Sequence, residues 1–209
     1  MNRVACKRVF EDGLRVHEIV EKAMGVLGRG ERCAIEPEFS LVLEDGLGGF
    51  FEVCGRPDMV FYDDSTRVIE IKYSTRDRPL SETELLQVLA YALMAGGKNV
   101  SAKVLRVIGE GEPRVKAIEV PVDEYTLRYV ERELKARLRF IELEKRLLGL
   151  DYRDTAIPGP YCVKCELRSR SECPVQGVAD FVAEYYSRTG RIPPFEHILR
   201  LFLREVKAK

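Results

Sequence analysis

The sequence contains no tryptophan, only two asparagines and only two glutamines, whereas lysine, arginine, aspartate and glutamate make up 33% of its 209 residues. A charged composition that is poor in amide side chains is typical of hyperthermophilic proteins. The 34 basic and 34 acidic residues cancel. Net charge therefore does not favour a nucleic-acid partner, and any DNA-binding surface must be a local feature.

A long apolar run is also lacking. The longest one, LLQVLAYALMAGG, contains a glutamine and is far shorter than the about 20 apolar residues that span a bilayer. No positively charged and then apolar leader of the secretory kind opens the chain. We therefore expect a cytoplasmic protein with no membrane partner. In that compartment the six cysteines are expected to be thiols or metal ligands rather than disulfides.

The hydrophobic pattern predicts an α/β or α+β protein built around one mixed sheet. Turn signals separate the first four expected strands, and their spacing predicts a meander. The capping pattern Ser81-x-x-Glu84 begins a helix that Gly96 and Gly97 end. The other expected elements are a helix at 13–27, strands at 38–45, 49–54, 58–62, 67–73, 101–108 and 114–121, a helix from Asp123 to about Leu148, and helices at 177–187 and 194–207.

Charged residues interrupt two of the expected strands. Glu70 and Lys72 share a face of their strand because side chains alternate along it. If the turn before this strand has an odd number of residues, Asp58 lies opposite Glu70, whereas an even turn requires a bulge. Two neighbouring carboxylates repel each other unless a divalent cation lies between them. With Lys72 facing the scissile group, this arrangement suits phosphodiester hydrolysis.

The alternative interpretation is an exposed Glu70–Lys72 ion pair with Asp58 as a turn residue. The context favours catalysis, because GLRVHE, GRPD, EIK and QVLAY resemble the motifs of the RecB-like branch of the PD-(D/E)xK nuclease superfamily. The resemblance implies a restriction-endonuclease-like core at 13–155 with Mg²⁺- or Mn²⁺-dependent deoxyribonuclease activity. The residues it implies are His17, Asp58, Glu70 and Ile71 at the metal, with Asp58, Glu70, Lys72, Gln87 and Tyr91 in the catalytic group.

Three cysteines near the carboxyl end have a spacing typical of metal ligands. Cys162, Cys165 and Cys173 form C-x2-C-x7-C, which is one ligand short of a tetrahedral set. Cys6, which precedes the His17 helix, is the preferred fourth ligand, and Cys33 is the alternative. The remaining cysteine, which lies in a strand at position 54, is expected to be a small buried hydrophobic residue.

RecB-like nucleases with one amino-terminal and three carboxyl-terminal cysteines carry an iron–sulfur cluster, and the match from Cys6 to Cys173 resembles the fourth CRISPR-associated exonuclease family. The resemblance implies one nuclease domain over 1–209, with cluster segments at 1–12 and 156–176 and a helical tail at 177–209. A [4Fe–4S] cluster is preferred, followed by [2Fe–2S] and then zinc.

The function that follows is a DNA exonuclease acting on single strands in CRISPR spacer acquisition, with DNA and CRISPR adaptation proteins as partners. Two alternatives stay open. One is a cluster-bearing DNA-binding or scaffold subunit with little nuclease activity, and the other is a stand-alone repair or recombination nuclease of the same branch. Arg76 and Arg78 follow Lys72 in the sequence. Two interpretations of this basic segment stay open, a grip on a DNA strand near the metal and ordinary solvated charges.

Two further segments carry surface predictions. The helix expected around 124–146 mixes charges of both signs at spacings of three and four, which predicts a solvated face. His197 is expected on the surface of the last helix. The apolar stripe of that helix should pack on its own domain, with a partner or a second protomer as the alternative. The stripe consists of Phe195, Ile198, Leu199 and Phe202.

Overall fold

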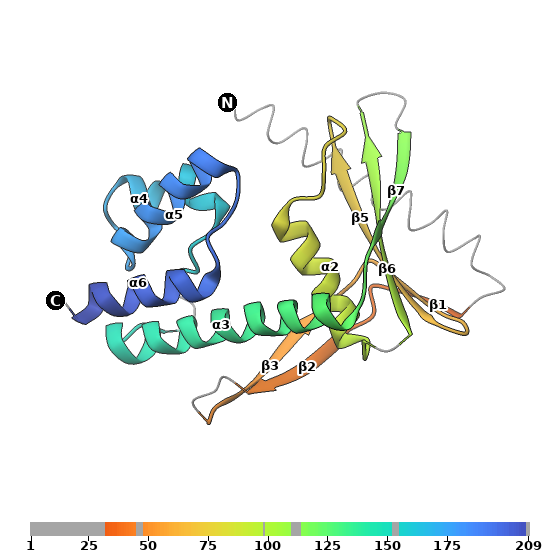
Figure 1. Ribbon diagram of the computed structural model, residues 1–209, viewed down its shortest axis with the longest axis horizontal. Helices are drawn as coiled ribbons and strands as arrows, with labels where there is room; N and C mark the ends of the chain where they lie inside the picture. Colours follow the sequence, from red (N-terminus) through yellow and green to blue (C-terminus); the bar gives the residue numbers. More distant parts are fainter. Residues whose placement is uncertain (1–31, 45–47, 98, 110–113, 152–154, 208–209) are drawn as a thin grey trace. The chain divides into compact units, whose positions relative to one another are not determined.

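A computed structural model describes residues 32–44, 48–97, 99–109, 114–151 and 155–207 (Figure 1). The chain forms two compact units. The first comprises the described residues up to Leu41 together with Glu52–Glu131, and the second comprises Val42–Phe51 and Arg132–Lys209. The helix expected at 13–27 lies outside the described residues.

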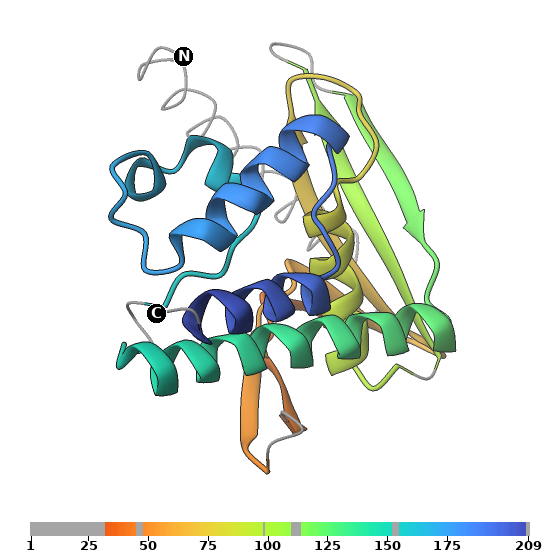
Figure 2. The ribbon, with the colours of Figure 1, turned by 60° about the vertical axis from the view of Figure 1, so that its left-hand side comes forward.

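The first unit is built on a five-stranded mixed sheet in the order β1–β4–β5–β6–β7. Its strands are β1 (Arg32–Ile35), β4 (Met59–Tyr62), β5 (Thr66–Ser74), β6 (Val100–Ile108) and β7 (Arg114–Val120). Only β5 and β6 pair in parallel, and the other neighbours are antiparallel. Helix α2 (Glu82–Met94) connects the parallel pair and lies against it (Figures 1 and 2). The predicted mixed α/β class is confirmed.

The predicted meander is wrong. Strands β2 (Phe39–Glu44) and β3 (Phe50–Gly55) form a separate two-stranded sheet, so β3 does not continue into the main sheet. Strand β1, which the sequence did not predict, pairs with β4 instead. The β2–β3 hairpin can form its hydrogen bonds between its own two strands. The alternation of side chains does not determine which strand, distant in sequence, becomes the neighbour of β4 in the main sheet.

Local sequence signals fix both ends of α2. The Ser81 side chain accepts from the backbone N–H of Glu84, and the Glu84 side chain accepts from the backbone N–H of Ser81, so the predicted capping box is confirmed. The helix ends just before Gly96 and Gly97, whose φ angles of 101° and 68° are left-handed. At the next helix, α3 (Glu124–Leu148), the Asp123 carboxylate accepts from the Thr126 N–H at 2.7 Å.

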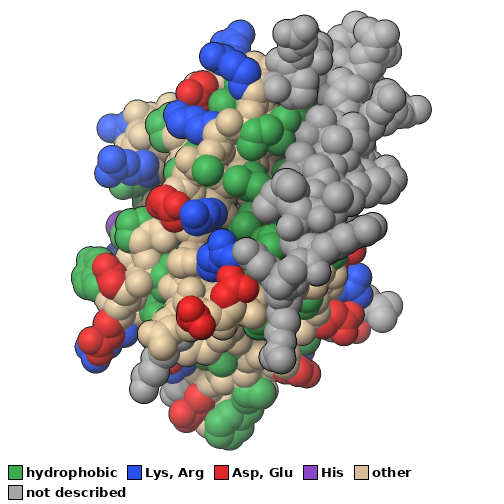
Figure 3. Space-filling view, turned by 90° about the vertical axis from the view of Figure 1, so that its right-hand side faces the viewer, with side chains coloured by type: hydrophobic (Ala, Val, Ile, Leu, Met, Phe, Trp, Pro, Cys, Tyr) green, Lys and Arg blue, Asp and Glu red, His purple; other side chains and the backbone are tan. Residues whose placement is uncertain are grey.

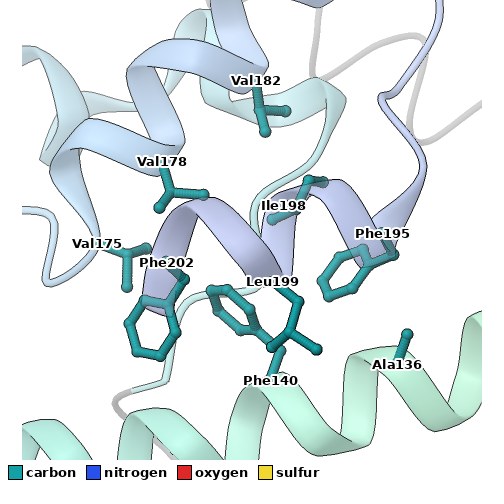
Figure 4. Close-up of a cluster of buried hydrophobic side chains, with 9 residues drawn as sticks. All are labelled: Ala136, Phe140, Val175, Val178, Val182, Phe195, Ile198, Leu199 and Phe202. Atoms are coloured by element: carbon teal, nitrogen blue, oxygen red, sulfur yellow. The ribbon is translucent and has the colours of Figure 1, made fainter. Parts of the chain in front are cut away.

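The second unit has a helical core. After α3 come the 3₁₀-helix η2 (Pro160–Lys164), α4 (Glu166–Ser169), α5 (Gln176–Thr189) and α6 (Phe195–Lys207). The stripe of α6 is buried within this unit, as predicted. Phe140 of α3 packs between Phe195 and Phe202, with ring centroids 5.5 and 4.7 Å away (Figure 4). His197 is exposed, also as predicted, and its ring contacts Phe181.

Candidate functional site

Asp58 and Glu70 lie side by side on neighbouring strands of the main sheet. The register of β4 and β5 pairs Met59 with Ile69, so the next position of the same register places Asp58 opposite Glu70. The turn between the strands is Asp63–Ser65, which has the odd length that this arrangement required. Of the two turn lengths considered from the sequence, the structure thus has the odd one.

Both carboxylates are buried, with Asp58 8% and Glu70 3% exposed. Asp58 Oδ2 accepts from the backbone N–H of Ile71 at 2.5 Å, and Glu70 Oε1 accepts from Lys72 Nζ at 2.5 Å. Burial and the charge of Asp58 raise the pKa of Glu70, against the opposing effect of Lys72. Glu70 Oε2 has no hydrogen-bond partner among the described residues, so this buried oxygen is available to a cation.

A chain of hydrogen bonds links this pair to α2. Lys72 Nζ donates to Gln87 Oε1 at 2.9 Å, and Gln87 Nε2 donates to Tyr91 Oη at 3.1 Å. Gln87 and Tyr91 lie one turn apart on the same face of the helix. Burial raises the pKa of the Tyr91 phenol, which therefore keeps its proton at neutral pH. The structure thus brings together all five residues of the predicted catalytic group.

Gly55, the first residue of GRPD, fits closely against this chain. A Cβ atom at Gly55 would lie 2.6 Å from Tyr91 Cε1 and 3.2 Å from Tyr91 Cδ1, closer than atoms pack. The missing side chain is therefore what lets the end of β3 pass beside the Tyr91 ring. The motif included this glycine, but its packing role was not predicted.

One predicted metal ligand, His17, lies outside the described residues. Asp58 and Glu70 supply two carboxylates, and Ile71 contributes its N–H to Asp58, but His17 is not among the described residues. Within the described ranges, no three His, Cys, Asp or Glu side chains form a group that could hold a metal ion. The buried pair and the orphaned Glu70 Oε2 fit the carboxylate part of a site for a hard divalent ion.

The three clustered cysteines line one cavity of about 150 Å³ in the second unit. Cys162, Cys165 and Cys173 are free cysteines in the structure. Burial raises the pKa of the Cys162 and Cys173 thiols. The rest of the wall is mainly apolar and includes Ile157 and Tyr161. Thiolates are ligands of zinc and of iron–sulfur clusters, but the three thiols do not form a group that could hold a metal ion among the described residues, so the cluster stays a prediction.

The other cysteines are in different places. Cys6 lies outside the described residues, so its role as fourth ligand stays a prediction. Cys33 lies on β1 in the first unit, opposite Phe61 of β4. The prediction for Cys54 is wrong, because this side chain is exposed and lines an open cavity of about 590 Å³ at the base of the β2–β3 hairpin.

Three buried charges among the described residues escaped the sequence-based prediction, namely Arg106, Glu133 and Glu144. Glu144 of α3 is 0% exposed, although its helix was expected to present a solvated charged face, and burial raises its pKa to about 7. Arg106 of β6 is also 0% exposed. The burial of Arg106 could have been predicted from its position, because Arg106 lies on the same face of the strand as the buried Ala102 and Val104.

The predicted DNA-binding cations Arg76 and Arg78 lie between β5 and α2. Arg78 is held by Glu84 through two hydrogen bonds of 2.8 Å. Arg76 lies in the same exposed connection, where its carbonyl accepts from Ser74 Oγ at 2.7 Å. In the described part of the face shown in Figure 3, basic and acidic side chains are interspersed. The contribution of these cations to DNA binding stays a prediction.

Comparison with known proteins assigns no family. The sequence matches no protein-family model, and the search of curated proteins found no match. A solved structure titled "Crystal structure of SSO0001" matches 61% of this chain and 63% of its own length, at 22% identity and a TM-score of 0.45. The match thus spans less than two thirds of that chain. None of the described helices is long and apolar enough to cross a membrane.

Proposed function

We propose that this protein is a metal-dependent DNA exonuclease that hydrolyses phosphodiester bonds in single-stranded DNA. The observation that carries the proposal is the buried pair of Asp58 and Glu70 beside the ammonium of Lys72. Two buried carboxylates at neighbouring positions destabilise a fold unless a positive charge joins them. Lys72 bonds only Oε1 of Glu70. Oε2 has no hydrogen-bond partner in the described part of the chain and would be the oxygen that binds the metal.

The residues of the site would have separate roles in the proposed reaction. Asp58 and Glu70, together with His17, would hold Mg²⁺ or Mn²⁺, which when bound would act as a Lewis acid on the phosphate. The Lys72 side chain is 23% exposed, and its ammonium would stabilise negative charge that develops on a bound phosphate. Gln87 fixes the other side of this ammonium. The Ile71 N–H holds Asp58 in place.

The cellular role rests on the resemblance of the motifs. We propose that the enzyme trims DNA for CRISPR spacer acquisition, and that Cys6, Cys162, Cys165 and Cys173 hold an iron–sulfur cluster. Such a cluster would join distant parts of the sequence and restrict the unfolded chain. The cavity that three of these cysteines line supports this part of the proposal.

The proposal is tested by removing the predicted charges one at a time. Asp58→Asn and Lys72→Ala should each reduce Mn²⁺-dependent cleavage of end-labelled single-stranded DNA by about 100-fold or more, as expected for groups that stabilise transition-state charge. The matched control is Asp64→Asn, which removes an exposed carboxylate in the turn between the same two strands. It should cleave like the wild type, and all variants should keep the wild-type circular dichroism.

Two results would contradict the proposal. Asp58→Asn and Lys72→Ala could both cleave at the wild-type rate, or cleavage by the wild type could be independent of added metal. DNA binding by a wild-type protein that shows no metal-stimulated cleavage would instead support the scaffold alternative. The polarity of cleavage follows from which labelled end loses nucleotides first.

A further inference from the structure

Arg106 lies beside Lys72 in the sheet. The parallel register of β5 and β6 pairs these two residues, so their side chains leave the same face on neighbouring strands. The guanidinium of Arg106 is fully buried. Its Nη1 donates to the carbonyls of Arg78 and Pro79, the latter at 3.2 Å, and its Nη2 donates to the Glu84 carboxylate at 3.1 Å.

Glu84 receives Arg106 while it also caps α2. Partial burial raises the pKa of Glu84, but hydrogen bonds from Arg78 and Ser81 outweigh burial and lower it below the ordinary value. The carboxylate is therefore charged at neutral pH and pairs with the buried guanidinium. Through these contacts Arg106 ties three parts together, namely β6, the connection from β5 to α2, and the first turn of α2.

Helix α2 is thus attached to the sheet at two points. Arg106 holds Glu84, and Lys72 holds Gln87. Glu84 and Gln87 are three residues apart and so share a face of the helix. The fork of a guanidinium fixes orientation as well as distance. A rotation or a shift of the first turn of α2 would therefore break the contact between Gln87 and Lys72.

We propose that Arg106 is a positioning residue that, through Glu84, sets α2 so that Gln87 holds the Lys72 ammonium beside Asp58 and Glu70. The effect of Arg106 on cleavage rests on the proposed function. The structural link from Arg106 through α2 to Lys72 does not rest on it, and this link can be tested without a cleavage assay.

The first measurement is the rate at which lysines are acylated, followed by mass spectrometry. In Arg106→Gln and Glu84→Gln, Lys72 should react about fivefold faster, as the loss of one hydrogen bond implies. Lys103 and Lys145 should keep their wild-type rates and serve as references. The matched control variant is Lys103→Gln, which removes the 2.7 Å ion pair between Lys103 of β6 and Glu119 of β7. With Lys145 as its reference, it should leave Lys72 labelling unchanged.

The second measurement is steady-state cleavage of single-stranded DNA. Arg106→Gln and Glu84→Gln should lower kcat about tenfold, the loss expected when a charge-stabilising group is displaced. The KM for DNA should stay at the wild-type value, because no DNA-contacting group is removed. Arg106→Lys should not rescue kcat, since an ammonium cannot reach three acceptors in the geometry of the guanidinium.

The outcomes separate the inference from the proposed function. Lys72 labelling at the wild-type rate in Glu84→Gln, or an equal rise at Lys103 and Lys145, would overturn the positioning role. Faster labelling of Lys72 alone supports it. If Arg106→Gln does not fold, Glu84→Gln, at a side chain that is 12% exposed, decides the question. If the wild type does not cleave DNA, the proposed function fails while the labelling result still stands.

Discussion

Substituting Glu144 by glutamine tests the buried carboxyl group of α3. Glu144 Oε1 accepts from the Ala156 N–H at 3.3 Å, and Oε2 has no hydrogen-bond partner among the described residues. Burial raises the pKa of this group from 4.5 to about 7. Glutamine has nearly the same shape and keeps an acceptor for Ala156, but it cannot ionise. The variant therefore isolates the cost of placing a charge at this position.

The sign and the size of the effect follow from proton linkage. Between pH 4.5 and about 7 the unfolded chain has released the Glu144 proton while the folded chain still holds it. The free energy of unfolding therefore falls as the pH rises through this window, and it levels off above it. The difference between the two pKa values corresponds to about 3 kcal/mol, at about 1.4 kcal/mol per pH unit.

The assay is guanidinium unfolding followed by circular dichroism at about pH 4.5 and about pH 8. Between these pH values the wild type should lose about 3 kcal/mol more stability than Glu144→Gln. The comparison of slopes removes any pH-independent cost of the buried amide. Glu184→Gln is the control, since its exposed carboxylate forms only a 3.5 Å surface pair with Arg188, and it should follow the wild type. Parallel pH profiles for the wild type and Glu144→Gln would refute the reasoning.

Three further predictions concern the cysteine cavity, the tyrosine contact and the helical core. Anaerobically purified protein should contain iron and acid-labile sulfide in equal amounts, and Cys165→Ser should lose both; zinc without sulfide would contradict the cluster. Gly55→Ala should lower the free energy of unfolding by about 1–3 kcal/mol through overpacking against the Tyr91 ring. Tyr91→Leu removes that ring, so in the double variant the effects of the two substitutions should not add. Phe140→Ala should cost about 3–5 kcal/mol in denaturant unfolding, because its ring is fully buried. The exposed Leu147→Ala should stay within about 0.5 kcal/mol of the wild type, and a similar loss for both would contradict the assigned core.

The arrangement of the five candidate residues was predictable because several local rules converge on it. Alternation placed Glu70 and Lys72 on one face, and turn length decided whether Asp58 joined them. The spacing of Gln87 and Tyr91 needed only the period of a helix. Each of these rules acts over a few residues, and each was satisfied in the folded chain.

The strand order was beyond the same rules. The segment Arg32–Ile35 is only four residues long, so it carries too little alternation to be recognised as a strand. Its pairing with β4 is also non-local, because the whole β2–β3 hairpin intervenes in the sequence. Choosing between β3 and β1 as the neighbour of β4 requires the three-dimensional packing, not the pattern of either segment.

Arg106 and Glu144 show when a buried charge can be recognised in a sequence. A strand has only two faces, so the period of the buried Ala102 and Val104 assigns Arg106 to the interior without ambiguity. A helix offers many angular positions, and the boundary between its buried and solvated faces depends on what packs against it. Glu144 lies in a segment dense in ion-pair spacings, which are typical of a solvated helix surface. Its burial therefore depends on neighbours that are distant in sequence, and charge patterning alone could not have revealed it.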